Sequence, residues 1–184
     1  MNINYTNHLT AKSDHHPLQN LGWGPYFQNQ LKIESHDPLS IARVVGVRKN
    51  SFQICDGESE WRATAAGRLI HQAHGLYPVT GDWVLVNDTM ITRVVVRKNA
   101  LSRAAAGTRG KSEIQPLKEQ VMAANLDTVF IVCGLDRDFN LRRIERYLTL
   151  VYNCGLNPAI VLTKADLHQD PTPFAHEVET VAFG

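Results

Sequence analysis

The residues most suggestive of chemistry form a short polar segment, Thr163-Lys164-Ala165-Asp166, directly after an apolar run at residues 158–162. Such a run is typical of a buried parallel strand, and ligands of open α/β sheets bind at the carboxyl ends of strands. A carboxylate at Asp166 can accept two hydrogen bonds from the N1–H and amino groups of guanine, a donor pair that adenine lacks. Lys164 can lay its aliphatic stem along the base plane, and the Thr163 hydroxyl can join neighbouring loops. A helix-capping aspartate beside a surface lysine would produce the same four residues, so the pattern alone leaves both interpretations open.

A strand–helix–strand unit is expected to position this segment. Residues 128–133 form a continuous apolar run, which predicts a strand buried on both faces. Asn140 is a predicted helix N-cap and Gly155 a C′ glycine. Between them an apolar stripe recurs at helical spacing: Leu141, Ile144, Tyr147, Leu148 and Val151. With the strand at residues 158–162 this makes a βαβ unit, followed by a last helix at residues 173–182.

The βαβ unit is predicted to be incompletely covered. Two parallel strands and little more than one full helix cannot cover both faces of a sheet. We therefore expect Val129, Ile131, Ile160 and Leu162 to expose apolar surface unless a partner covers it.

A small β-barrel is predicted for residues 39–97. Asp56-Gly57 is a strong hairpin signal, and residues 68–78 are expected to form a longer loop. Five short strands with no long helix indicate a closed barrel, because closure removes the exposed edges of an open sheet. An OB-fold fits best, and an SH3-like barrel is the second choice. The strands are expected at residues 41–47, 51–55, 60–65, 82–87 and 91–96.

Two tryptophans of this segment, Trp61 and Trp83, have the flat faces that bases stack on. Strand alternation places at least one of them toward the barrel interior, and for each we favour a packing role over stacking.

Basic residues concentrate in the barrel and the segment after it. Residues 41–112 hold 11 Lys and Arg against five Asp and Glu, although the whole chain has a formal net charge of +1. This excess predicts a surface that binds a polyanion such as RNA, with an ordinary solvated surface as the alternative. Residues 98–120 are predicted to be a basic, flexible connector. Residues 1–38 are predicted to be a flexible N-terminal arm with room for one short anchored piece. The candidate RNA-binding residues are Arg48, Lys49, Arg97, Lys98, Arg103, Arg109 and Lys111.

Composition excludes several classes of protein. No apolar run approaches the roughly 20 residues that a membrane span needs, and the polar first 20 residues carry no apolar core of a secretion signal. Three scattered cysteines are too few for a disulfide framework, so a reducing, cytoplasmic compartment is expected. His71 and His74 have metal-ligand spacing but no suitable partners, and we expect no metal site.

Several stretches of the chain, in the same order, resemble the ribosome small-subunit-dependent GTPase family RsgA, also called YjeQ. Two of them are Gly81-Asp82-Trp83-Val84 and the segment from Arg97 to Arg103. The others run from Gln120 to Val129, from Phe139 to Leu148, and from Val161 to Leu167. Together the resemblance covers roughly residues 41–167.

The resemblance implies an N-terminal OB-fold, a circularly permuted GTPase domain and a C-terminal zinc-binding domain. It implies GTP or GDP with Mg²⁺ as ligands, the 30S subunit and 16S ribosomal RNA as partners, and a monomer that acts late in small-subunit maturation. Thr163, Lys164 and Asp166 fall on the family's guanine-specificity motif, with threonine where asparagine is common.

The chain departs from the family pattern in three ways. It contains no G-x-x-x-x-G-K-[S/T] phosphate loop, since Gly110-Lys111-Ser112 follows no buried strand and is interpreted as accidental. No Asp-x-x-Gly segment follows Asp166, and no cysteine–histidine cluster of zinc-site spacing occurs. Residues 121–184 are therefore expected to be an incomplete, truncated P-loop-type GTPase domain without catalytic residues, inactive alone. The alternatives are a stand-alone RNA-binding module with a degenerate nucleotide-binding remnant, and a protein-interaction barrel without a nucleotide role.

Overall fold

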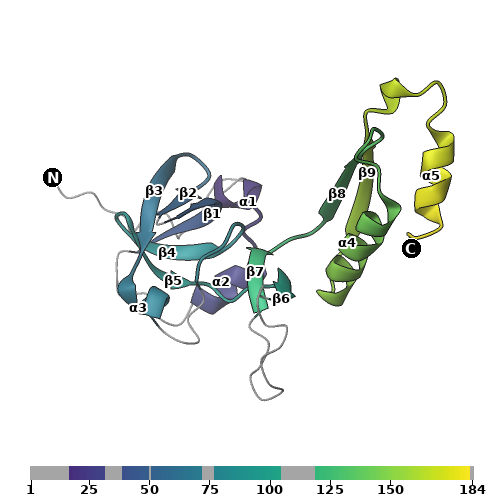
Figure 1. Cartoon of the computed structure of the whole chain (residues 1–184). Helices are drawn as coiled ribbons and strands as arrows, with labels where there is room; N and C mark the ends of the chain where they lie inside the picture. The colour runs from purple at the N-terminus through teal and green to yellow at the C-terminus, as the bar shows by residue number, and fades with distance from the viewer. Residues whose placement is uncertain (1–16, 32–38, 50, 72–76, 105–118, 183–184) are drawn as a thin grey trace, which may run out of the picture. The chain divides into compact units, whose positions relative to one another are not determined.

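The computed structural model describes residues 17–31, 39–49, 51–71, 77–104 and 119–182. These residues divide into two compact units, Met1–Lys98 and Asn99–Gly184, which are described separately below (Figure 1).

The first unit is built on a closed five-stranded barrel. Its strands pair in the order β1-β2-β3-β5-β4, with β4 closing on β1. The β3–β5 pairing is parallel and the other four are antiparallel. Every strand is therefore paired on both edges, and the predicted OB-fold barrel is confirmed. The strands are β1 (Ser40–Arg48), β2 (Ser51–Cys55), β3 (Glu60–Ala65), β4 (Trp83–Asn87) and β5 (Met90–Val94).

Strand alternation fills the barrel interior with apolar side chains. Phe52 and Ile54 of β2 face Val84 and Val86 of β4 and Ile91 of β5 in one buried cluster, because every second residue of a strand points to the same side. Trp61 packs against this cluster, as the alternation predicted for at least one tryptophan.

The other tryptophan, Trp83, is buried in a different place. It contacts two short helices, α1 (Pro17–Asn20) and α2 (Pro25–Leu31), through Leu18 and Phe27. The ring centroids of Trp23 and Trp83 lie 4.8 Å apart, and the two rings meet edge to face. Residues 17–31 of the predicted arm are thus packed as two helices, a longer piece than the single short one expected, because an outward-facing tryptophan on β4 gives these helices an apolar surface to bury.

Two predicted loops also contain regular structure. The helix α3 (Gly67–His71) lies in the segment predicted as a long loop. The predicted connector begins and ends in strands, because β6 (Ala100–Ala104) pairs antiparallel with β7 (Glu119–Ala124). Residues 105–118 lie outside the described part of the chain.

The second unit continues with the predicted βαβ arrangement. Strands β8 (Val129–Gly134) and β9 (Pro158–Thr163) are parallel and directly paired, with α4 (Leu141–Asn153) between them in sequence (Figure 1). The Asn140 side chain accepts a hydrogen bond from the Arg143 N–H at 3.0 Å, and Gly155 has the positive φ of a C′ glycine, +65°. A short 3₁₀ helix, η2 (Ala165–Leu167), and α5 (Thr172–Glu179) follow.

Helix α4 covers one face of this two-stranded sheet. Ile131 and Cys133 of β8 are buried against α4 residues such as Ile144 and Leu148. Phe130 and Val132, which alternate with them, are 65% and 64% exposed. The prediction that β8 is buried on both faces is wrong, and the exposed positions are Phe130 and Val132 rather than Ile131, because the helix packs on the side of the odd-numbered residues. Among the described residues, no helix combines the length and apolar character needed to cross a membrane.

Candidate functional site at the ends of two parallel strands

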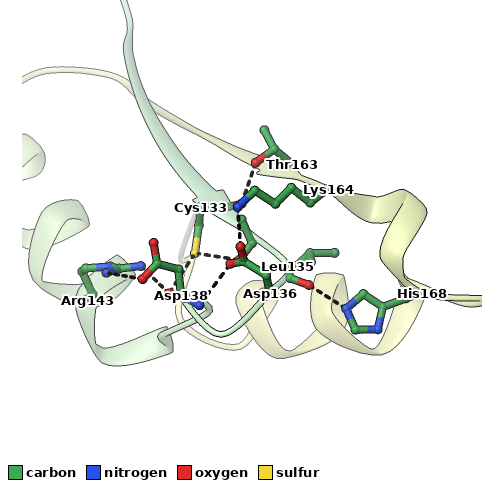
Figure 2. A network of polar contacts seen from close by, with 9 residues as sticks. Cys133, Leu135, Asp136, Asp138, Arg143, Thr163, Lys164 and His168 are labelled. Carbon is green, nitrogen blue, oxygen red and sulfur yellow. Dashed lines mark hydrogen bonds and ion pairs between the residues drawn. The ribbon is translucent and has the colours of Figure 1, made fainter.

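The carboxyl ends of β8 and β9 bring the predicted polar segment beside a second loop. Gly134 and Thr163 are partners in the parallel register, and the Leu135 N–H donates to the Thr163 carbonyl at 2.9 Å. The Thr163 hydroxyl donates to the Cys133 carbonyl at 3.5 Å (Figure 2). Thr163 thus joins the two strand ends, the role that the sequence suggested for its hydroxyl.

Lys164 lies across the end of β8. A Cβ atom placed on Gly134 would lie 3.3 Å from Cδ and 3.4 Å from Cε of Lys164, so the aliphatic stem passes close over the glycine backbone. The Lys164 ammonium group makes an ion pair with the Asp136 carboxylate (Figure 2). The backbone of Lys164 is left-handed, with φ +60° and ψ +33°.

Asp136 is the site residue that sequence reasoning missed. Its Oδ1 atom also accepts the Asp138 N–H at 3.0 Å. The hydrogen bond from Lys164, and then the one from the Asp138 N–H, lower the pKa of Asp136, and the same carboxylate raises the pKa of Lys164. The rule that directed attention to the end of β9 would have found Asp136, because it is the first carboxylate after the neighbouring parallel strand.

Asp166 occupies the first turn of η2 and is exposed. Within the described residues its carboxylate has no hydrogen bond or ion pair, so both oxygens are open to a ligand. The structure therefore places an unengaged acceptor beside the fixed Lys164.

His168 links the segment after η2 to the β8 loop. Its Nε2 atom lies 2.6 Å from the Leu135 carbonyl oxygen. A carbonyl only accepts, so Nε2 carries the proton in this arrangement. The His168 ring also contacts Phe174, with ring centroids 4.6 Å apart, and Phe174 packs on Phe139 at 5.1 Å. Through these ring contacts, Phe174 of α5 connects Phe139 in the segment after β8 to His168 in the segment after β9.

The described acidic groups near the site do not form a Mg²⁺ site. Asp136 is paired with Lys164, and Asp138 lies 3.9 Å from an Arg143 nitrogen. No group of three His, Cys, Asp or Glu side chains in the described ranges is arranged to hold a metal ion.

One predicted RNA-binding residue is committed to the barrel instead. Arg97 donates to both carboxylate oxygens of the fully buried Asp82, at 2.8 Å each, and to the Tyr77 carbonyl at 2.9 Å. Its side chain is only 11% exposed. Asp82 also accepts the Val79 N–H at 2.8 Å. Arg97 is therefore a structural residue, and the prediction that it forms part of a free basic surface is not supported by its surroundings.

The other candidate RNA-binding residues are distributed over both units. Arg48 and Lys49 are exposed where β1 turns toward β2, and Lys98 is exposed at the end of the first unit. Arg103 is exposed on β6, 3.4 Å from the Gln120 side-chain oxygen. Arg109, Lys111 and His74, and the side chain of His71, lie outside the described part of the chain.

Asn99 joins its side chain to the backbone of Leu126 by two hydrogen bonds, which were also not predicted from the sequence. Its side-chain amide donates to the Leu126 carbonyl and its side-chain oxygen accepts the Leu126 N–H, both at 2.7 Å. Asn99 thereby fixes the start of β6 to the segment after β7. A lone asparagine in a basic stretch carries no sequence signal for such a contact.

A closed OB-type barrel followed by a βαβ unit is the order of domains that the resemblance to the RsgA family predicts. Residues 94–182 match the family model described as RsgA GTPase. The chain is 40% identical over 182 residues to the small ribosomal subunit biogenesis GTPase RsgA 2 of Vibrio parahaemolyticus, covering 97% of this chain and 47% of that protein. It is 38% identical over 173 residues to RsgA of Syntrophotalea carbinolica, covering 91% of this chain and 48% of that protein. The chain is thus related to the RsgA family, and the resemblance noted in its sequence is confirmed.

A solved structure shows a similar fold. The chain matches YjeQ from Thermotoga maritima with a TM-score of 0.53 and 22% identity, covering 77% of this chain and 48% of that one. The chain spans about half the length of the curated relatives that it matches.

Proposed function

We propose that this chain is the RNA-binding and guanine-recognising portion of an RsgA-type ribosome biogenesis GTPase. The observation that carries the proposal is the parallel pairing of β8 and β9, which ends in Gly134 and Thr163 and leaves the Asp166 carboxylate exposed beside a fixed Lys164. Ligand sites of open α/β sheets lie at this end of the strands.

Each residue of the motif has a separate task in this proposal. Asp166 accepts the two hydrogen bonds from the guanine edge, and charge on the carboxylate makes these bonds about twice as strong as neutral ones. Lys164 covers the base plane with its stem, and Thr163 holds the strand ends together. Phosphoryl transfer needs a phosphate cradle, Mg²⁺ and a positioned water, and these 184 residues contain no phosphate-loop motif. GTP hydrolysis with Mg²⁺, the circularly permuted domain order and the zinc-binding domain are therefore proposed for the full-length protein only, and this chain alone is proposed to be inactive.

The barrel is proposed to bind 16S ribosomal RNA on the 30S subunit, in the cytoplasm and as a monomer. OB-folds bind oligonucleotides on the face of strands 2 and 3 and on the adjoining loops, and Arg48 and Lys49 lie at the loop between β1 and β2. Lys98 and Arg103 are the other candidate RNA-binding residues that the structure describes. Arg97 is not proposed to bind RNA, because its guanidinium group is already paired with the Asp82 carboxylate.

Guanine recognition is tested by NMR titration of this chain with GMP, AMP and XMP. We expect GMP to shift the amides of residues 134–136 and 163–168 with a dissociation constant no tighter than millimolar, and AMP to have no effect. Asp166→Asn replaces one acceptor by a donor, so it should lose GMP and gain XMP, whose position-2 carbonyl accepts. Asp170→Asn is the matched control, because the Asp170 carboxylate instead accepts the Thr172 N–H at the start of α5. An Asp166→Asn chain that still prefers GMP would refute the base-recognition role.

RNA binding is tested by the dependence of affinity on salt. Each phosphate contact contributes about 0.7 to 0.9 to the slope of log affinity against log salt. Replacing Arg48 and Lys49 together by Ala should therefore lower the slope by about 1.4 to 1.8. Replacing the exposed Arg137 and Arg142 of the second unit removes the same charge and should leave the slope unchanged. An unchanged slope in the Arg48/Lys49 variant would exclude these residues from the interface.

The two experiments together separate the alternatives. Salt-dependent RNA binding without any response to GMP would favour a stand-alone RNA-binding module with a degenerate remnant. Absence of both responses would favour a protein-interaction barrel.

A further inference from the structure

Lys164 has a backbone conformation that its residue type disfavours. Three non-glycine residues of the described chain have positive φ: Asp88 at +52°, Asn125 at +55° and Lys164 at +60°. Aspartate and asparagine tolerate this region because their short polar side chains bond locally, whereas lysine gains no such compensation. Strained backbone of this kind persists where the surroundings determine it, and it concentrates at ligand sites.

The surroundings of Lys164 show what holds it. On one side the missing side chain of Gly134 leaves room for the lysine stem, whose Cδ and Cε would lie 3.3 and 3.4 Å from a Cβ atom there. On the other side the ammonium group meets the Asp136 carboxylate. The stem is thus fixed at both ends, by its left-handed backbone and by an ion pair.

Asp136 is itself anchored from the β8 side. Its second oxygen accepts the Asp138 N–H at 3.0 Å, and the preceding Leu135 carbonyl accepts from His168 at 2.6 Å. The side chain is 28% exposed, compared with 53% for Lys164. The carboxylate is the better fixed partner, so it orients the lysine rather than the reverse.

We propose that Asp136 is a positioning residue for guanine recognition: its carboxylate holds the Lys164 ammonium group so that the lysine stem crosses Gly134 and forms one wall of the base site. The proposal rests on the proposed function, because it assigns Asp136 to that same site. Asp136 sets how tightly a base is held, and Asp166 sets which base is held.

Affinity and base preference should therefore separate in an NMR titration of the full chain with GMP and AMP. Asp136→Asn keeps the shape of the side chain but removes its charge. An exposed ion pair stabilises by an amount equivalent to about two- to fivefold in affinity, so GMP should bind about two- to fivefold more weakly, with GMP still preferred over AMP. Asp136→Glu restores the charge and should recover at least half of the loss. Asp170→Asn removes the same charge at a carboxylate that accepts the Thr172 N–H at the start of α5, and it should bind GMP as the wild type does.

A double-mutant cycle with Lys164→Met shows whether Asp136 changes the GMP affinity through Lys164. If Asp136 acts through Lys164, the double variant should bind GMP no more weakly than Lys164→Met alone. Additive losses would overturn the proposal, as would wild-type affinity in Asp136→Asn or an equal loss in Asp170→Asn. If the wild-type chain gives no shifts with GMP, the proposed function fails and the positioning role fails with it. If the wild type binds GMP and Asp136→Asn binds it equally well, only the positioning role fails.

Discussion

The barrel and the βαβ unit differ in how completely their sheets are buried. All five barrel strands are paired on both edges and enclose one apolar core. The β8–β9 sheet has two strands, and Phe130 and Val132 stand exposed on the face opposite Ile131 and Cys133. Closure makes a sheet self-sufficient, whereas a parallel sheet requires a layer on each face.

The two regions also differ in how far their charged pairs are buried. Arg97 and Asp82 form a buried pair in the first unit, where Asp82 directly precedes β4 and is fully buried. Lys164 and Asp136 form an exposed pair at the carboxyl ends of the parallel strands β8 and β9. The pair in the first unit is therefore part of its buried structure, and the pair in the βαβ unit is accessible to solvent.

The largest expected effect comes from breaking the buried pair. Arg97→Met leaves the Asp82 carboxylate buried without its cation, and breaking one side of such a pair costs about 3–5 kcal/mol. We expect the free energy of unfolding of the first unit to fall by that amount in urea denaturation followed by tryptophan fluorescence. All three tryptophans lie in the first unit, so the signal reports on it alone.

The control for this prediction is Arg48→Met, which removes the same charge from an exposed position. Its free energy of unfolding should stay within about 0.5 kcal/mol of the wild type. A loss below about 1 kcal/mol for Arg97→Met would mean that the pair is not formed in solution, because breaking a buried pair costs several times more.

An intermediate effect is expected on the two faces of β8. Ile131→Ala removes a side chain buried against α4 and should cost about 2–5 kcal/mol. Phe130→Ala removes a larger side chain that is 65% exposed and should change stability by less than about 0.5 kcal/mol. Hydrogen exchange of the β8 and β9 amides, measured by NMR, gives the change in stability for each of the two variants. Equal costs would show that the Phe130 face is covered in solution, and the contrast with the barrel would then disappear.

The strands and helices that were predicted well are those with a local signal. The bounds of β2 and β3 match the predicted residues, because Asp56-Gly57 fixes the hairpin between them. Helix α4 follows from its apolar stripe and from the caps at Asn140 and Gly155. The predicted order of strand, helix and strand then placed Thr163, Lys164 and Asp166 at the carboxyl end of β9.

The features that were missed depend on contacts between distant residues. Helices α1 and α2 are short and lack a periodic stripe of their own, and they form against Trp83, some 60 residues away. The engagement of Arg97 depends on Asp82, and that of Lys164 on Asp136 in another strand's loop. A sequence shows that a charged residue is present, but whether it is free or paired is decided by the fold.

The smallest expected effect is the pH dependence of the exposed pair. The hydrogen bond from Lys164 lowers the pKa of Asp136, so the folded chain binds this proton less readily than the unfolded chain. The contribution of the pair to stability is therefore fully present above about pH 4, the ordinary range of an aspartate, and is lost as the pH falls through the lowered pKa. Carbon-13 NMR titration of the Asp136 carboxyl group should show a lowered pKa in the wild type and in the control Lys49→Met. In Lys164→Met the pKa should be closer to the ordinary value, with the hydrogen bond from the Asp138 N–H still lowering it. An unchanged pKa in Lys164→Met would mean that the ammonium group does not hold Asp136 in solution, and the comparison between this exposed pair and the buried pair of Arg97 and Asp82 would then fail.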